Sequence, residues 1–340
     1  MARLTQAIKN LTRLTSLSTR VLADVPFLAT ALVQRPPSYT VPAFVNVGIA
    51  GYVAGGYNGT ARVTRIDKIT FPADTKTTIA GVLSSAKTKG AGFANSSVAG
   101  YAAGGLSAAT ADYVSTIDRV AFPADTVTTL SATLSVAVNA PAGFANSAVA
   151  GYSAGGYGTS YNDFIDKITF PAETRTTLVA TLSTTLDTAS GFANSGVAGY
   201  VAGGESPYLS SIDKITFSAD TRSTLSATLT SARNETACFA NSGVAGYVAG
   251  GNDGTNNLSG IDKITFPADT KTTLSATLTG IIQQAAGFAN SGVAGYVAGG
   301  ATLTDRIDKI TFPADTKTTL SAVLTVAVIR CYGFANSGVL

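Results

Sequence analysis

The chain has 340 residues, of which 45% are hydrophobic and 13% are charged, and its net charge is +3. This length and apolar content suffice for a sizeable core, whereas so small a positive charge does not support nucleic-acid binding. The chain has no histidine, which excludes Ser-His-Asp, Cys-His and histidine-ligated metal sites. Its two cysteines, Cys238 and Cys331, lack metal-ligand spacing, so two buried free thiols are expected. No apolar run is long enough to predict a membrane span.

Residues 1–42 differ from the rest of the chain. Apolar side chains recur at seven-residue spacing, at Ala7, Leu14, Val21 and Leu28. This pattern predicts an amphipathic helix or a short coiled-coil seam that breaks near Pro26, followed by a proline-stiffened linker. Three roles remain open for this segment. It could be an anchor that packs against a partner or a second copy of the chain, a helix folded onto the main domain, or a targeting peptide.

Two phrases alternate from residue 43 to residue 340. The first reads GFANSSVAGYAAGG at 92–105, and the second reads IDKITFPADTKTTL at 261–274. The tyrosine of the first phrase marks six copies, at Tyr52, Tyr101, Tyr152, Tyr200, Tyr247 and Tyr296. The nearly constant spacing from Tyr52 to Tyr101, to Tyr152 and onward indicates one supersecondary unit used repeatedly. Residues 43–340 are therefore expected to form one domain.

Each unit reads as four short strands. GFANSGV, YVAGG, IDKITF and TTLSATL are the candidates, with Gly-containing and FPADT turns between them. Four antiparallel strands repeated six times predict an all-β fold, a six-bladed β-propeller. A β-solenoid is the alternative, but the chain shows no distinct capping repeat, which an open array would need.

The GFAN phrase occurs once more often than the other strands. We therefore predict that 333–340, with Phe334 and Asn336, completes the blade whose other strands lie at 51–83, and that 43–49 is a lead-in. Hydrogen bonds between the two ends of the repeat region would then close the ring. The closure would fail if 333–340 were unpaired or paired within another subunit.

Several repeated residues invite a functional interpretation. The aspartate of IDKITF recurs six times, but a repeated position cannot alone build a single asymmetric site, so one structural hydrogen bond or ion pair per blade is expected. The double glycine is expected to serve close backbone approach or a positive φ. The asparagine of FANS either lines the central channel or caps a turn.

The order of these signals resembles the kelch repeat. A strand ending in Gly-Gly, a variable loop, a strand before an Asp- and Pro-containing turn and a Thr-rich strand follow one another in all six units, over roughly 43–340. The kelch tryptophan is absent, so Ile79, its leucine equivalents or their neighbours must fill its place. The wording IDKITFPADT with AGFANSGVAGY is similar to kelch-like repeats of bacteriophage virion proteins, especially of cyanophages, which are tail, fibre or capsid-associated components.

The variable stretches between the phrases all belong to one face of the predicted propeller, and loops on a rigid scaffold are where binding usually resides. The candidate binding residues there are Tyr57, Tyr113, Tyr157, Tyr161, Phe164, Tyr208 and Asp253. Relaxed drift of surface loops is the alternative explanation for this variation. NDGTNN at 252–257 only faintly resembles a calcium loop, and no metal or other cofactor is predicted.

The resemblance implies a virion protein that is structural and not an enzyme. Residues 1–42 would bind other virion proteins or sister chains in a homo-oligomer, and the propeller would contact a protein or a glycan of the host surface. A soluble, lectin-like carbohydrate-binding propeller is the alternative function. An enzyme with paired acids drawn from the loops, such as Asp112 and Asp163, is disfavoured because no pair forms a recognisable motif.

Overall fold

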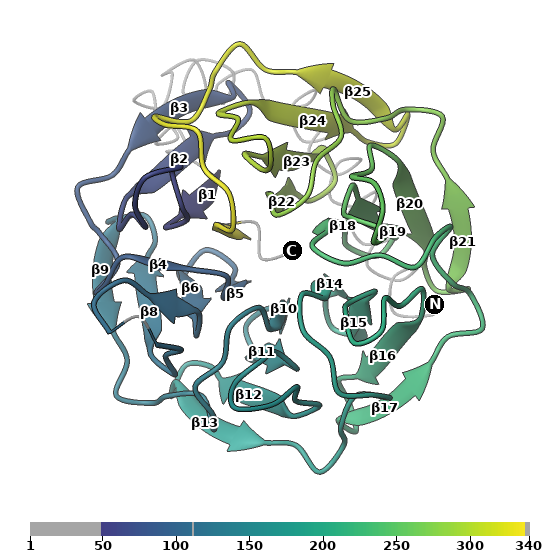
Figure 1. Ribbon diagram of the computed structural model, residues 1–340, viewed down its shortest axis with the longest axis horizontal. Helices are drawn as coiled ribbons and strands as arrows, with labels where there is room; N and C mark the ends of the chain where they lie inside the picture. The colour runs from purple at the N-terminus through teal and green to yellow at the C-terminus, as the bar shows by residue number, and fades with distance from the viewer. Residues whose placement is uncertain (1–48, 111, 337–340) are drawn as a thin grey trace, which may run out of the picture. The chain divides into compact units, whose positions relative to one another are not determined.

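Six four-stranded antiparallel sheets surround a central axis in the computed structural model, which describes residues 49–110 and 112–336 (Figure 1). From the axis outward, blade 1 contains β26 (Tyr332–Ala335), β1 (Ala50–Ala54), β2 (Ile66–Thr70) and β3 (Thr75–Thr78). Blade 2 contains β5 (Ala91–Asn95), β6 (Ala99–Ala103), β8 (Ile117–Ala121) and β9 (Thr126–Thr129). Blade 3 contains β10 (Ala142–Asn146), β11 (Ala150–Ala154), β12 (Ile165–Thr169) and β13 (Thr174–Thr177).

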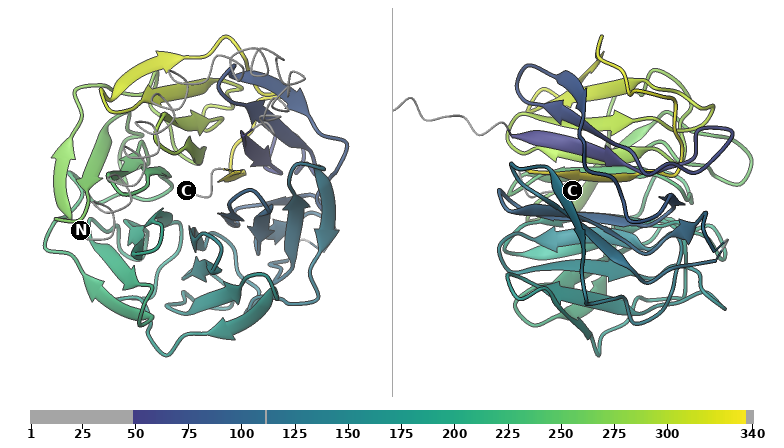
Figure 2. Two further views of the ribbon diagram at one scale, coloured as in Figure 1. Left: turned by 180° about the vertical axis from the view of Figure 1, so that it is seen from behind. Right: turned by 90° about the vertical axis from the view of Figure 1, so that its left-hand side faces the viewer.

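The remaining three blades repeat this order (Figure 2). Blade 4 contains β14 (Ser190–Asn194), β15 (Ala198–Ala202), β16 (Ile212–Thr216) and β17 (Thr221–Thr224). Blade 5 contains β18 (Ala237–Asn241), β19 (Ala245–Ala249), β20 (Ile261–Thr265) and β21 (Thr270–Thr273). Blade 6 contains β22 (Ala286–Asn290), β23 (Ala294–Ala298), β24 (Ile307–Thr311) and β25 (Thr316–Thr319). The predicted six-bladed β-propeller is confirmed.

Some sequence predictions lie outside the described residues: those on 1–42, on the start of the domain at residue 43, on the lead-in up to residue 48 and on the last four residues. Among the residues that are described, no helix is long and apolar enough to cross a membrane.

Burial decreases from the inner strands to the outer strands. Nearly every residue of the two inner strands of a blade is buried, because both of their faces pack against neighbouring blades. The third strand alternates, as in β20, and the fourth is largely exposed, as in β21. The prediction that TTLSATL forms the fourth strand was wrong in its bounds. The strand ends at Thr273, and Leu278 instead leaves the blade and is buried in the hydrophobic cluster of blades 5 and 6.

The ring is closed by β26, which pairs antiparallel with β1 in the register Gly51↔Ala335 to Ala54↔Tyr332. The strand that ends the described chain therefore supplies the innermost strand of the first blade, as the excess GFAN phrase predicts (Figure 1). Phe334 is fully buried in this strand, and the backbone N–H of Asn336 donates to the carbonyl of Ala50 at 2.8 Å.

A phenylalanine on each innermost strand packs over a glycine of the next blade. Phe192, which is fully buried, lies against Gly246 of blade 5, where an added Cβ would be only 2.1 Å from the phenyl ring. The same contact joins Phe288 to Gly51 across the closure. Glycine at the AGY position is therefore required by the approach of the neighbouring blade.

The tyrosine of each blade is sandwiched between two phenyl rings. Tyr152 stacks on Phe144 of its own blade at 5.0 Å and on Phe217 of the next at 5.3 Å between ring centroids. Its hydroxyl donates to Asp220 at 3.2 Å, and Lys167 Nζ lies 2.6 Å from the same carboxylate. Burial, together with this acid, raises the pKa of Tyr152 well above its usual range. An equivalent Tyr-acid pair joins every blade to the next.

The repeated aspartate of the third strand also joins blades. The 3%-exposed carboxylate of Asp213 accepts the Thr224 hydroxyl of its own blade at 2.6 Å and the backbone N–H of Ser183, in the connection from blade 3, at 2.7 Å. The other five aspartates make the same two contacts. The prediction of one structural hydrogen bond repeated in every blade is confirmed.

The asparagine and the double glycine of the repeat also have structural roles. Asn194 Oδ1 accepts the backbone N–H of Gly243 in the next blade at 3.0 Å, and Asn95, Asn146 and Asn241 act likewise. Of the two alternatives for this residue, turn capping is therefore shown, across the boundary between blades. Both members of each double glycine have a positive φ, as at Gly55 (60°) and Gly56 (104°), which confirms the expectation.

Replacing one blade-contact glycine should destabilise the whole ring. We predict that Gly246→Ala lowers the free energy of unfolding by about 1–3 kcal/mol, because the new methyl group overlaps the Phe192 ring. Chemical denaturation measures this difference. Gly260→Ala is the matched control, since nothing lies within 4 Å of an added Cβ there. Equal losses in the two variants would contradict the packing explanation.

Candidate binding face and channel mouth

The connections from first to second strand and from third to fourth strand lie on one face of the ring, because all sheets are antiparallel. The remaining connections lie together on the opposite face, here called the variable face. Its inner part has a repeated backbone. In blades 1, 3, 4 and 5 the connection entering the blade pairs with the residue after the double glycine, as Asp187 does with Glu205 and Asn234 with Asn252. In blade 2 this pairing is extended to two short strands, β4 (Lys87–Thr88) and β7 (Leu106–Ser107).

Six equivalent residues, one per blade, form the rim of the central channel on this face. They lie three positions before the first residue of each GFAN phrase or its CFAN variant: Lys89, Ala140, Thr188, Glu235, Gln284 and Arg330. Each backbone N–H donates to the carbonyl of the preceding rim residue, from Lys89 to Arg330 at 2.9 Å and onward to Arg330 donating to Gln284 at 2.7 Å. The six hydrogen bonds make a closed circle.

All six rim residues adopt a left-handed backbone, with φ between 52° and 60°. This conformation favours glycine, and a non-glycine residue there is uncommon. None of the six is glycine, and no two are alike, although the phrases on either side are nearly identical. The rim is thus a constant backbone that displays six different side chains toward one axis.

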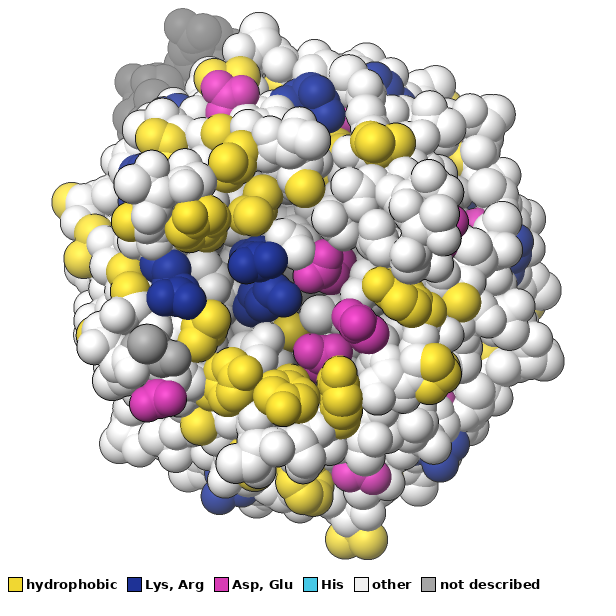
Figure 3. Space-filling model, viewed as in Figure 1, with side chains coloured by type: hydrophobic (Ala, Val, Ile, Leu, Met, Phe, Trp, Pro, Cys, Tyr) yellow, Lys and Arg dark blue, Asp and Glu magenta, His cyan; other side chains and the backbone are white. Residues whose placement is uncertain are grey.

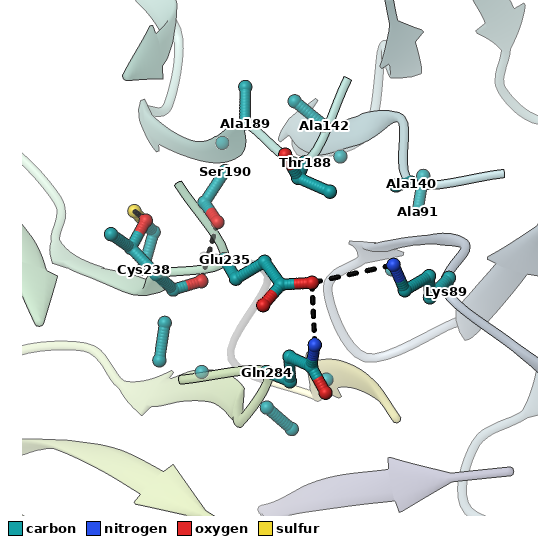
Figure 4. Close-up of a pocket in the computed structure, with 18 of the residues that line it drawn as sticks. Lys89, Ala91, Ala140, Ala142, Thr188, Ala189, Ser190, Glu235, Cys238 and Gln284 are labelled. Atoms are coloured by element: carbon teal, nitrogen blue, oxygen red, sulfur yellow. Dashed lines mark hydrogen bonds and ion pairs between the residues drawn. The ribbon is translucent and has the colours of Figure 1, made fainter. Parts of the chain in front are cut away.

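The rim side chains form a network across the channel mouth. Glu235 Oε1 accepts from Gln284 Nε2 at 2.6 Å and lies 3.4 Å from Lys89 Nζ, which comes from the opposite side of the ring (Figure 4). Gln284 Oε1 in turn accepts from Arg330 Nε at 3.0 Å. The mouth encloses a cavity of about 120 Å³, whose lining reaches down to the glycines of the innermost strands.

On the variable face, basic side chains lie on one side of this mouth and acidic side chains on the other. Figure 3 shows basic and acidic side chains side by side at its centre. On the acidic side, burial and the charge of Glu205 raise the pKa of Asp187 to about 6, while Lys89 opposes the shift. Glu205 accepts a hydrogen bond from Asn234 Nδ2 at 2.7 Å. Asp187 and Glu205 also raise the pKa of the exposed Tyr161 phenol.

Three of the predicted binding residues form an aromatic row. Tyr113 meets Tyr157 edge to face at 5.8 Å, and Tyr157 meets Tyr161 at 5.0 Å. Phe164 follows Tyr161 in the same loop and is 42% exposed. The structure thus brings the residues of blades 2 and 3 together.

Of the other predicted binding residues, Tyr57 and Asp253 hydrogen-bond within their own loops, whereas Tyr208 contacts the loop of the next blade. Tyr57 donates to the carbonyl of Gly59 at 2.7 Å, and Tyr208 lies against Gly254 of the following loop. Asp253 Oδ1 accepts the backbone N–H groups of Thr255 and Asn256, and these hydrogen bonds lower its pKa. Asp253 is therefore a turn-capping residue. Within the described ranges no cluster of three acidic, cysteine or histidine side chains could hold a metal ion.

Two cationic side chains are buried in the connections that lead to the rim residues Lys89 and Glu235. Lys87 lies 3.1 Å from Asp118, and Arg233 lies 2.7 Å from Asp262. Burial lowers the pKa of Lys87, and Asp118 opposes that shift. Both thiols are free. Burial raises the pKa of both thiols to about 12, although Cys331 as a whole residue is only half-buried.

Sequence reasoning missed the rim residues. It treated the connection before each GFAN phrase as a loop with a changing sequence and emphasised aromatic residues. The signal was their constant distance from the phrase combined with a different residue in every copy. That pattern is typical of a fixed backbone with freely varied side chains.

Fold and face together define a six-bladed β-propeller repeat protein whose blade contacts are constant and whose side-chain differences gather on one face. Comparison with models of known protein families finds no match to the chain, and a search of curated protein sequences finds no significant relative.

The raised pKa of Asp187 predicts a pH-dependent stability. The folded state holds this proton more tightly than the unfolded state, so the contribution of Asp187 to stability falls as pH rises from about 4 to above about 6. Asp187→Asn should be more stable than the parent at about pH 8, by about 1 kcal/mol after allowing for solvent screening, and equal to it at about pH 4. Thermal unfolding at both pH values tests this. A parent that is the more stable of the two at pH 8 would refute it.

Proposed function

We propose that the protein is a structural component of a bacteriophage virion, associated with the tail, a fibre or the capsid. Its propeller presents the variable face to another protein or to the host surface, and residues 1–42 attach it to the particle. The observation that carries the proposal is the confinement of side-chain differences to one face of a nearly invariant ring.

The blade contacts support a scaffold role. The repeated polar groups, such as Asp213, Tyr152 and Asn194, are committed to contacts between blades. Recognition is then left to the variable face, which combines a rigid backbone with an aromatic row and a charged channel mouth. Such a surface suits binding, because little conformational entropy is lost when its side chains engage a partner.

The order of strand, double glycine, loop and acidic turn supports a kelch-like repeat. Leu134, Leu182 and their equivalents are buried between blades, which supplies the apolar volume that the absent tryptophan would provide.

Removal of residues 1–42 tests the attachment role. The protein comprising residues 43–340 should keep the β-rich circular dichroism spectrum and the thermal midpoint of the full chain. It should no longer be incorporated when particles are assembled in its presence, as measured by mass spectrometry of purified particles. Full incorporation of the shortened chain would contradict the proposal.

Carbohydrate binding is the second candidate function, favoured by the row of Tyr113, Tyr157 and Tyr161 beside Asp187 and Glu205. Aromatic faces stack on sugar rings, while carboxylates accept hydrogen bonds from hydroxyl groups. A glycan array probed with the parent, Tyr157→Ala and the control Tyr57→Ala should show at least about tenfold weaker binding for Tyr157→Ala alone. An array without any bound glycan would eliminate this candidate.

A further inference from the structure

The six rim residues are the one repeated position of the inner scaffold that differs in every blade. Glycine would suit their left-handed backbone better than any of the residues present. The structural hydrogen bonds at this position use only backbone atoms, so they do not explain why side chains are retained. The rim side chains therefore point to a role in the space that they surround.

That space is asymmetric in charge. Lys89 and Arg330 are adjacent on one side, and Glu235 lies on the other. Between Lys89 and Thr188 the rim residue is Ala140, so this side of the mouth holds only small side chains (Figure 4). The wall below is built of small side chains, mostly glycine and alanine such as Ala142 and Ala189, with Ser190 and Cys238 among them.

The channel mouth keeps both hydrogen-bond donors and a hydrogen-bond acceptor for a ligand. Among the described residues, Arg330 uses only Nε, toward Gln284, which leaves its two terminal nitrogens as donors. Glu235 uses Oε1 for both of its contacts, which leaves Oε2 as an acceptor. The Lys89–Glu235 pair is held at 3.4 Å with side chains 22% and 12% exposed, so its partners are accessible from the mouth.

From this geometry we propose that the channel mouth binds a small zwitterion of the α-amino acid class. The carboxylate of the ligand accepts from Arg330 and Lys89, and its ammonium group donates to Glu235. The small aliphatic wall accommodates the ligand side chain. This site is distinct from the aromatic row, and the proposal does not depend on a virion role.

The Lys89–Glu235 ion pair explains why the ligand needs both a positive and a negative charge. A ligand with one charge that displaced Lys89 from Glu235 would leave the other partner partly buried without compensation. A ligand with both charges exchanges one ion pair for two and leaves neither partner unpaired. The free acceptor Oε2 further favours a primary ammonium group over a quaternary one, which has no N–H to donate.

Ligand binding to the full-length protein tests the proposal. The probes are the standard free L-amino acids, screened by saturation-transfer NMR and then measured by calorimetry at roughly millimolar concentration. We expect at least one to bind, and its N-acetyl and amide derivatives, which each lack one charge, to bind at least about tenfold more weakly. No binding by any free amino acid, or equal binding by either derivative, would overturn the proposal.

Two variants locate the site. Glu235→Gln and Arg330→Gln should each weaken binding by at least about tenfold, whereas Lys76→Gln, on the outer strand β3, should change it by less than about twofold. Thermal unfolding of each variant confirms that it remains folded. Full affinity in either folded rim variant would place the binding elsewhere and overturn the assignment.

Discussion

The buried aspartate of the third strand is the contact on which the ring depends most directly. One carboxylate binds the outer strand of its own blade and the backbone of the incoming connection, as Asp213 binds Thr224 and Ser183. Charge-assisted hydrogen bonds of this kind are stronger than neutral ones, and they offset the cost of burying the carboxylate. Because the contact recurs six times around a closed ring, every blade is held by both neighbours.

The same logic explains the near-identity of the repeats. A phenyl ring over Gly246, a tyrosine between two phenyl rings and an asparagine that caps the next turn each require a partner in the adjacent blade. A change in one blade must therefore be tolerated by the next. The rim residues escape this constraint, since the hydrogen bonds that join them to neighbouring blades use the backbone, and there the sequence differs from copy to copy.

Much of the fold could be predicted because the repeat reports it directly. Six tyrosines give the blades, and the seventh GFAN phrase gives the closing strand β26. The last residue of the outer strand could not be predicted from the sequence. The Thr-rich run continues after Thr273, although the chain leaves the strand there and crosses to the next blade. The aromatic candidates were found by residue type, but only three of them converge. The rim was missed because its six residues differ in chemistry, and only the closed ring brings their side chains together around one axis.

Unfolding free energies of two variants test the separation of scaffold and face most directly. One replaces all rim residues other than Ala140 by alanine, and the other is Asp213→Ala. The rim variant should stay within about 2 kcal/mol of the parent, since partly exposed ion pairs contribute little. Asp213→Ala should lose roughly 3 kcal/mol or more, because it removes two hydrogen bonds to a buried, charged carboxylate. A rim variant less stable than Asp213→Ala would contradict the account.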